Sequence, residues 1–263
     1  MSCLRCIRID FGALALAAMA LLPAPALAEV AVGAARVIVA DVSAETALAS
    51  RKLATSDDVR YQELIATDRS SAAVIQFIDA TQLAIGEQAR VRLDDFVFDP
   101  GAAGKLNLSV EFGAIRFSTG SMAKPAYRIV TPSATLAVRG TEFDLAVDND
   151  GATYLMVRDG AVEITGRNGD SKLVGAAESV TVSAAGVPSQ PRIAAATPAG
   201  VLPGKIAAMD IALAEAFAKA PAGDLDDLSV LSKARSLHPD TRSEFGKPDK
   251  PSKDKKGGGP GPR

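Results

Sequence analysis

Short apolar runs recur along the chain from residue 59 to residue 182, and Gly, Asp or Asn breaks each run. Apolar and polar residues alternate within the runs, most strictly in L-N-L-S-V-E-F at 106–112. A period of two is typical of strands with one buried face. Asp-Gly and Asn-Gly pairs at 150–151, 159–160 and 168–169 tolerate the positive φ of tight hairpins. The pattern predicts an all-β domain.

The stretch at 127–143 predicts two strands, at 127–130 and 134–138, and a third that begins at Phe143. The residues between them form the expected turns: Thr131, Pro132, Arg139, Gly140 and Thr141. Gly140 would allow a bend or bulge. Arg139 has two interpretations, a structural ion pair or an exposed recognition point, and we favour the first, with Glu142 or Asp144 as its partner.

The same pattern divides the chain into segments. Residues 29–57 predict a strand at 36–42 followed by a short helix or a loop at 44–55. We favour the loop, because residues 51–52 and 55–58 show no stable apolar face. The β domain covers 58–183, and a linker at 184–205 follows, where four prolines prevent a sheet from continuing. Residues 206–236 predict a helical segment, and 237–263 a disordered basic tail that has almost nothing to bury.

The helical segment carries Ile206, Met209, Leu213 and Phe217 on one face. This face could pack on the β domain. It could also dock a partner, since apolar residues at this spacing fill hydrophobic grooves.

The N-terminus predicts a secretory signal peptide over residues 1–28. Arg5 and Arg8 precede an apolar run at 11–22, and Ala26-Leu27-Ala28 supplies the small residues of a cleavage site after Ala28. The run is too short to span a membrane, and no later segment approaches that length, so we expect no transmembrane span in the mature chain. We therefore expect a periplasmic or secreted protein. Both cysteines lie in the cleaved part, which excludes thiol chemistry afterwards.

Composition argues against several partners. A net charge of −2 gives no attraction for nucleic acid, and an aromatic share of 5% without Trp disfavours a stacking platform for single strands. The tail from residue 246 holds six basic residues against two acidic ones, so a weak contact with an anionic envelope surface is one hypothesis.

No catalytic, cofactor or metal site is predicted. His238 is the only histidine and precedes Pro239 without an orienting partner. A calcium loop at 148–151 fails because its first and last ligand positions would be Ala146 and Val157. The carboxylate pairs are interpreted as solvent-facing; they are Asp94 with Asp95 and Glu142 with Asp144.

Several segments in order carry a family resemblance. They are A-V-I-Q-F-I-D at 73–79, L-A-I-G at 83–86, G-A-I-R-F-S-T-G at 113–120, Y-R-I-V-T-P at 127–132, A-V-R-G-T-E-F at 137–143 and D-G-A-V at 159–162. Over about residues 58–182 the chain resembles the FecR-domain family. It departs from that pattern at Ala80, where the family's Asp-Gly-Ser turn has Gly.

The resemblance implies a fold of stacked short strands, a β-solenoid or roll-like arrangement, and no enzyme activity. The family is named after a regulator that senses iron-dicitrate transport through a periplasmic domain, which a membrane helix joins to a segment controlling a sigma factor. We expect an exported, non-enzymatic module for protein interaction or envelope assembly, with an envelope or secreted protein as partner. The alternative is a ligand-sensing component of an envelope signalling pathway of that type. The sequence does not indicate the oligomeric state.

Overall fold

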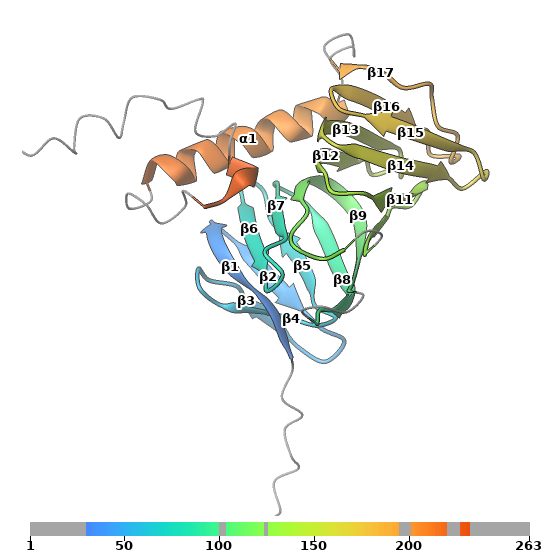
Figure 1. The fold of residues 1–263 in the computed structure, drawn as a ribbon. Coiled ribbons are helices and arrows are strands. Elements are labelled where there is room, and N and C mark those ends of the chain that lie inside the picture. The colour runs from blue at the N-terminus through green and yellow to red at the C-terminus, as the bar shows by residue number, and fades with distance from the viewer. Residues whose placement is uncertain (1–29, 100–103, 124–125, 195–200, 220–226, 232–263) are drawn as a thin grey trace, which may run out of the picture. The chain divides into compact units, whose positions relative to one another are not determined.

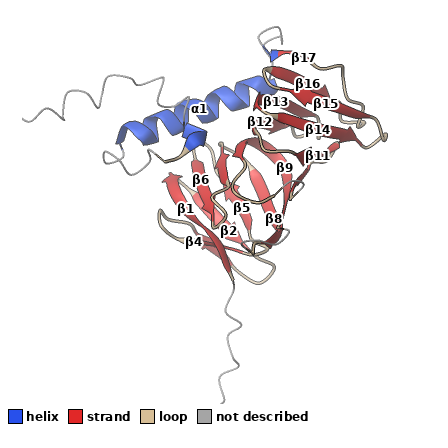
Figure 2. Ribbon diagram, viewed as in Figure 1, coloured by secondary structure: helices blue, strands red, loops and turns tan. Residues whose placement is uncertain are grey.

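The computed structural model describes residues 30–99, 104–123, 126–194, 201–219 and 227–231. The predicted signal peptide and basic tail lie outside these ranges. Strands predominate in the described part, and its one α-helix is α1 (Val201–Lys219), as Figure 2 shows. The expectation of an all-β fold with a short helical extension is confirmed.

The strands, shown in Figure 1, form two sheets, which we name A and B and which β9 joins into one hydrogen-bonded system. Sheet A contains, in spatial order, β4 (Asp58–Arg60), β1 (Ala31–Val39), β6 (Ala72–Phe77), β7 (Gln82–Ile85), the end of β9 (Lys105–Ser118), β12 (Glu142–Val147), β13 (Thr153–Asp159), β16 (Glu178–Val182) and β17 (Arg192–Ile193). Sheet B contains β3 (Ser50–Lys52), β2 (Val42–Glu45), β5 (Leu64–Thr67), β8 (Arg90–Val97), the start of β9, β10 (Tyr127–Val130), β11 (Ala134–Val138), β14 (Ala161–Gly166) and β15 (Ser171–Gly175).

Strand β9 joins the two sheets. Its residues up to Phe112 pair with β8, and those from Gly113 onward pair with β12. Gly113 has a φ of 100°, a conformation that residues with a Cβ rarely adopt, so the strand can turn from one sheet into the other there. All strand pairs are antiparallel except β9 with β10. The stacking of short strands is therefore a two-sheet antiparallel arrangement, and the β-solenoid form is not confirmed.

The inward faces of both sheets share one hydrophobic core. Phe117 of β9 belongs to this core, with its ring centroid 5.8 Å from that of Tyr127 and 5.4 Å from that of Phe143. The two ends of the central 127–143 stretch thus meet on one side chain. Strands β10 and β11 have the predicted bounds, and β12 begins one residue earlier than predicted.

A buried turn fastens β6 to this core. Asp79 Oδ2 accepts hydrogen bonds from Thr81 Oγ1 at 2.6 Å and from the Tyr127 hydroxyl at 3.0 Å. That hydroxyl in turn accepts from the Met122 N–H at 3.2 Å. Burial raises the pKa of Tyr127. Between Asp79 and Thr81, Ala80 has a φ of 66°, so it adopts the left-handed conformation that favours glycine.

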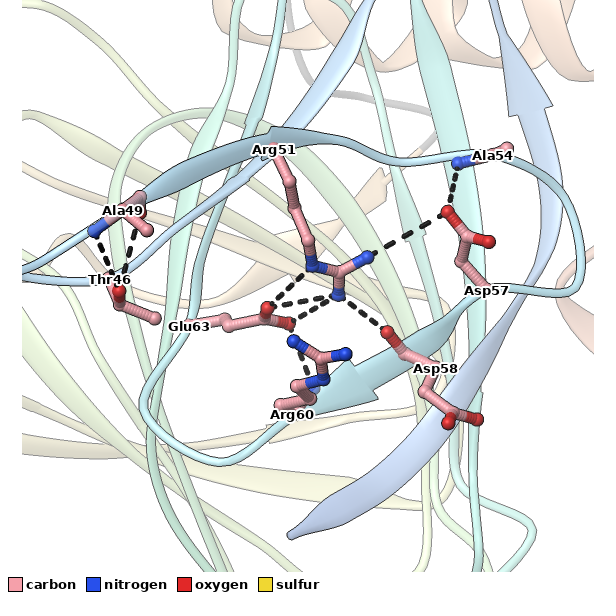
Figure 3. A network of polar contacts seen from close by, with 8 residues as sticks. All are labelled: Thr46, Ala49, Arg51, Ala54, Asp57, Asp58, Arg60 and Glu63. Carbon is pink, nitrogen blue, oxygen red and sulfur yellow. Dashed lines mark hydrogen bonds and ion pairs between the residues drawn. The ribbon is translucent and has the colours of Figure 1, made fainter. Parts of the chain in front are cut away.

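The expected loop at 44–55 is wrong, because β2 and β3 form a hairpin there. Figure 3 shows the contacts that hold it. Glu63 is buried and accepts from Arg51 Nε at 3.1 Å, from Arg51 Nη2 at 2.9 Å and from the Arg60 N–H at 2.8 Å. Arg51 Nη2 also donates to the Asp58 carbonyl at 2.6 Å. The ion pair between Arg51 and Glu63 thus holds this hairpin in place, although the hairpin lacks an apolar face.

Part of the predicted linker is also ordered. Strand β17 pairs with β16, and α1 begins at Val201 rather than at Ile206. Pro203 lies in the first turn of α1, where its missing N–H breaks no helical hydrogen bond. The second part of the expected helical segment contains η2 (Ser229–Leu231), one turn of 3-10 helix.

Candidate functional site

The predicted turn residues between β10 and β12 have structural roles in the turns that join these strands. Thr131 Oγ1 accepts from the Ala134 N–H at 3.0 Å and lies 2.9 Å from the Thr153 hydroxyl in a buried contact. Pro132 is exposed, Gly140 has a φ of 67°, and Thr141 is buried.

Arg139 is not the structural ion-pair residue that we expected. Its side chain is 61% exposed, and its Nη2 lies 3.6 Å from Glu163 Oε2 rather than beside Glu142 or Asp144. A pair this exposed contributes roughly 0–1 kcal/mol. Arg139 therefore cannot hold the strands together.

Two alternatives were open for the apolar face of α1, and the structure shows it packed on the β domain. Ile206, Met209 and Leu213 are buried against the outer face of sheet A. The Phe217 side chain lies outside the described residues. Gly86 permits the close approach, since a Cβ there would lie 3.0 Å from Met209 Cβ. The small side chains of the alanines at 72, 84, 114 and 146 also allow the helix to pack close to the sheet.

Beside this apolar area, one row of polar side chains crosses the outer face of sheet A. We call it the polar row, and it consists of Arg36, Gln76, Gln82, Ser118 and Glu142. Register aligns the last four, because Gln76 pairs with Gln82, Gln82 with Ser118, and Ser118 with Glu142. Arg36 of β1 donates a hydrogen bond to the Gln76 side chain. Five neighbouring strands thus present polar groups along one line.

The polar row holds the backbone of residues 227–230. Gln82 Oε1 accepts from the Val230 N–H at 3.3 Å, and Gln82 Nε2 donates to the Asp227 carbonyl at 3.1 Å. Arg36 Nη2 lies 3.3 Å from the Asp227 carboxylate. Ser229 Oγ lies 3.0 Å from Ser118 Oγ.

A buried ion cluster joins the sheet to α1 as well. Arg116 of β9 contacts Asp144 Oδ1 through Nε at 2.6 Å and Asp210 Oδ1 of α1 through Nη2 at 2.8 Å. Its Nη1 donates to the Val230 carbonyl at 3.2 Å. Arg158 of β13 contacts Asp144 Oδ2 at 2.6 Å. The side chains of Arg116 and Asp144 are 0% exposed, that of Asp210 3% and that of Arg158 22%.

Two arginines and two aspartates give this cluster a net charge of zero. Burial by itself would lower the pKa of Arg116, but the neighbouring charges of Asp144 and Asp210 outweigh it, so the pKa is raised. Burial raises the pKa of Glu142, and the positive charges of Arg116 and Arg158 only partly offset this effect. The expectation that Glu142 and Asp144 lie on a solvent-facing surface is therefore wrong for Asp144, which α1 covers.

The remaining sequence candidates do not form a site. At the surface of β8 and β9, the Asp94 carboxylate accepts a hydrogen bond from the Ser109 hydroxyl, and the Asp95 carboxylate accepts one from the Lys105 ammonium group. Residues 148–151 form a turn in which the Gly151 N–H donates to the Asp148 carbonyl at 2.9 Å. His238 and the basic tail lie outside the described residues. Within the described ranges, no three His, Cys, Asp or Glu side chains are placed to hold a metal ion. None of the helices in those ranges is long and apolar enough to cross a membrane.

The residues that matter at this face were not singled out from the sequence. Arg116 alternates with apolar neighbours, as a solvent-facing strand residue would. Asp210 gave a usable signal, because it falls on the same helical face as Ile206, Met209 and Leu213, where an acidic side chain needs a partner.

The comparison with protein-family models agrees with the resemblance seen in the sequence. The model of the family described as "FecR protein" matches residues 63–163 of the chain. Two crystal structures of a proposed anti-sigma factor from Parabacteroides distasonis ATCC 8503, at 2.50 and 1.65 Å, are similar at 16% and 17% identity, with TM-scores of 0.41 and 0.42. In each case the similarity covers 49% of this chain and 59% of the other, so the chain spans less than two thirds of those proteins. No curated protein matches the chain.

Proposed function

We propose that this protein is an exported, non-enzymatic FecR-type module for protein binding, and that the outer face of sheet A is its binding surface. One observation carries the proposal. Side chains of the polar row hydrogen-bond the backbone of residues 227–230, which is how a peptide-binding surface holds a chain segment. In this state the protein's own helix α1 and its residues 227–231 occupy the surface.

The composition of the face supports binding of a protein. It combines an apolar area, formed by residues such as Val74 and Tyr154, with buried charges that lie within reach of the bound helix. A buried ion pair often stabilises a contact no better than apolar residues of the same shape would. Here the ion pair between Arg116 and Asp210 selects which helix can bind. A helix that lacks an acidic residue at the position of Asp210 would leave the charge of Arg116 incompletely neutralised.

The proposals of export and of a non-enzymatic role rest on the sequence. Arg5, Arg8 and the small residues up to Ala28 have the pattern of a cleaved signal. N-terminal sequencing of the protein from the periplasm or medium should give Glu29 as the first residue. Reproducible turnover of any envelope polymer by the purified protein would contradict the non-enzymatic role.

A sensing role in envelope signalling is the second candidate, and the FecR match over 63–163 favours it. Such a role would use the same surface if a signal released the helix from sheet A. It predicts that a sigma-factor-dependent reporter responds when the helix contact is weakened. The interaction role without signalling predicts no reporter response.

Photo-crosslinking in intact cells tests the binding surface. A photoreactive residue replaces Glu142, which is half-buried at the rim of the covered face, or Leu173, which is 65% exposed on the outer face of sheet B. We expect crosslinks to a partner from position 142, and more of them when Asp210→Ala weakens the helix contact. Crosslinks from position 173 but not from position 142 would place binding on the other sheet.

A further inference from the structure

We infer that the polar row of sheet A, together with Arg116, forms a binding site for a short peptide segment of a partner protein. That segment presents an acidic residue, leucine, a small hydroxyl residue and valine in consecutive positions. Residues 227–230, Asp-Leu-Ser-Val, occupy the site within the chain. The inference rests on the proposed function and specifies the chemistry of its partner.

The backbone contacts are the first argument. The Val230 N–H and carbonyl and the Asp227 carbonyl all bond side chains of the sheet, through Gln82 and Arg116. These contacts need only a backbone in this conformation and do not depend on which chain supplies it. Main-chain hydrogen bonds of this kind give affinity for an extended or single-turn peptide.

The side chains of the segment supply selectivity. Leu228 and Val230 are 0% exposed, and both belong to the apolar cluster beneath α1. Asp227 lies opposite Arg36, with side chains 55% and 31% exposed, so this pair adds charge preference more than affinity. Ser229 reaches both Gln82 and Ser118 with its hydroxyl, at 3.2 and 3.0 Å. Apolar and polar positions therefore alternate, and each has its own place on the sheet.

The segment on the site is part of the same chain, so a partner peptide must compete with it. A tethered ligand has an effective concentration of about millimolar or higher. The apparent affinity for an added peptide is proportional to the fraction of molecules whose site is open, so it is low while the chain's own segment occupies the site. Weakening the chain's own segment should therefore strengthen binding of the added peptide, whereas weakening the sheet side should abolish it.

The test uses a fluorescein-labelled peptide of residues 224–233 and the full chain. In the variant Leu228→Asp with Val230→Asp, the chain's own segment is weakened and the sheet is unchanged. We expect this variant to bind the peptide at least about tenfold more tightly than the wild type, as measured by fluorescence anisotropy. Adding Gln82→Ala to that variant should reduce the affinity at least about tenfold, because the peptide loses two backbone contacts.

Two controls accompany the measurement. A peptide with the same two Asp replacements should not bind, and Glu215→Ala on the exposed side of α1 should bind like the wild type. Where the double Asp variant does not fold, Val230→Ser replaces it. The inference is overturned if the weakened variants bind no more tightly than the wild type, or if Gln82→Ala leaves the affinity unchanged. Crosslinking from position 142 without peptide binding would leave the proposed function in place with a different partner segment.

Discussion

Asp210→Ala is the change that best separates the helix from the sheets. Asp210 is the residue of α1 that meets the Arg116 guanidinium, at 2.8 Å, while Asp144 keeps its own contact with Arg116 from the sheet. Removing Asp210 changes the net charge of the cluster from zero to +1 while the helix is docked. Once the helix has left, water solvates Arg116 and the variant loses nothing relative to the wild type.

The magnitude follows from this difference. Breaking a buried ion pair by removing one partner costs about 3–5 kcal/mol, but Arg116 retains Asp144, so we expect about 2–3 kcal/mol. Burial of Ile206, Met209 and Leu213 stabilises the docked helix by about 1.5–3 kcal/mol for each side chain. The helix should therefore remain docked on average and open about 30- to 150-fold more often.

Native-state hydrogen exchange measures this opening segment by segment. We expect faster exchange in α1 and in residues 227–231, with unchanged protection in β7, β10 and β11. Glu215→Ala is the matched control, because it also removes a carboxylate from α1 but from its exposed side. Equal loss of protection in α1 and in the strands would refute the reasoning, since the cluster would then hold the sheets together. Wild-type exchange in α1 would refute it as well.

Three further predictions concern single residues. Ala80→Gly should raise the free energy of unfolding in urea by about 0.5–1 kcal/mol, because the φ of 66° strains alanine; an unchanged midpoint would contradict this. Tyr127→Phe should lower that free energy by about 1–3 kcal/mol, because the buried Asp79 carboxylate and the Met122 N–H lose a partner; a cost below about 0.5 kcal/mol in urea would contradict it. Glu142→Gln should stabilise the protein at pH 7 but not at pH 4. The raised pKa of Glu142 means that the folded state binds more protons just above pH 4.5, so wild-type stability falls as pH rises through that window, and urea titrations of both proteins at the two pH values check the difference.

Local signals were sufficient where the turn chemistry was strong. Thr131-Pro132 and Gly140 stand at the ends of β10 and β11, and both strands have the predicted bounds. Strand β3 was missed because Ser50, Arg51 and Lys52 include no apolar residue, and its order depends on Glu63 further along the chain. A window of ten residues does not contain that contact.

The error at Asp144 has a different cause. Strand alternation correctly places Asp144 on the face opposite Phe143 and Leu145. Whether that face meets water depends on α1, which begins more than fifty residues later. For the same reason Arg116 was not singled out, and the candidate site was missed with it. Periodicity identifies the face of a strand, but only tertiary contacts determine what covers that face.

The residues of the candidate site come from two separate parts of the chain. Gln82, Arg116, Asp144 and Arg158 lie within residues 63–163, the stretch that matches the FecR family. Asp210 and the residues from Asp227 to Val230 lie outside it. Most of the receiving side of the contact thus lies in the stretch that matches the FecR model, with Arg36 of β1 outside it, whereas the segment that fills the site belongs to the C-terminal extension. If the sheet accepts any segment with the right chemistry, grafting the Asp-Leu-Ser-Val residues onto a neutral carrier protein should be enough for binding to the Leu228→Asp, Val230→Asp variant. A carrier that binds only when α1 is grafted with them would show that the helix, through Asp210, is the part that sheet A recognises.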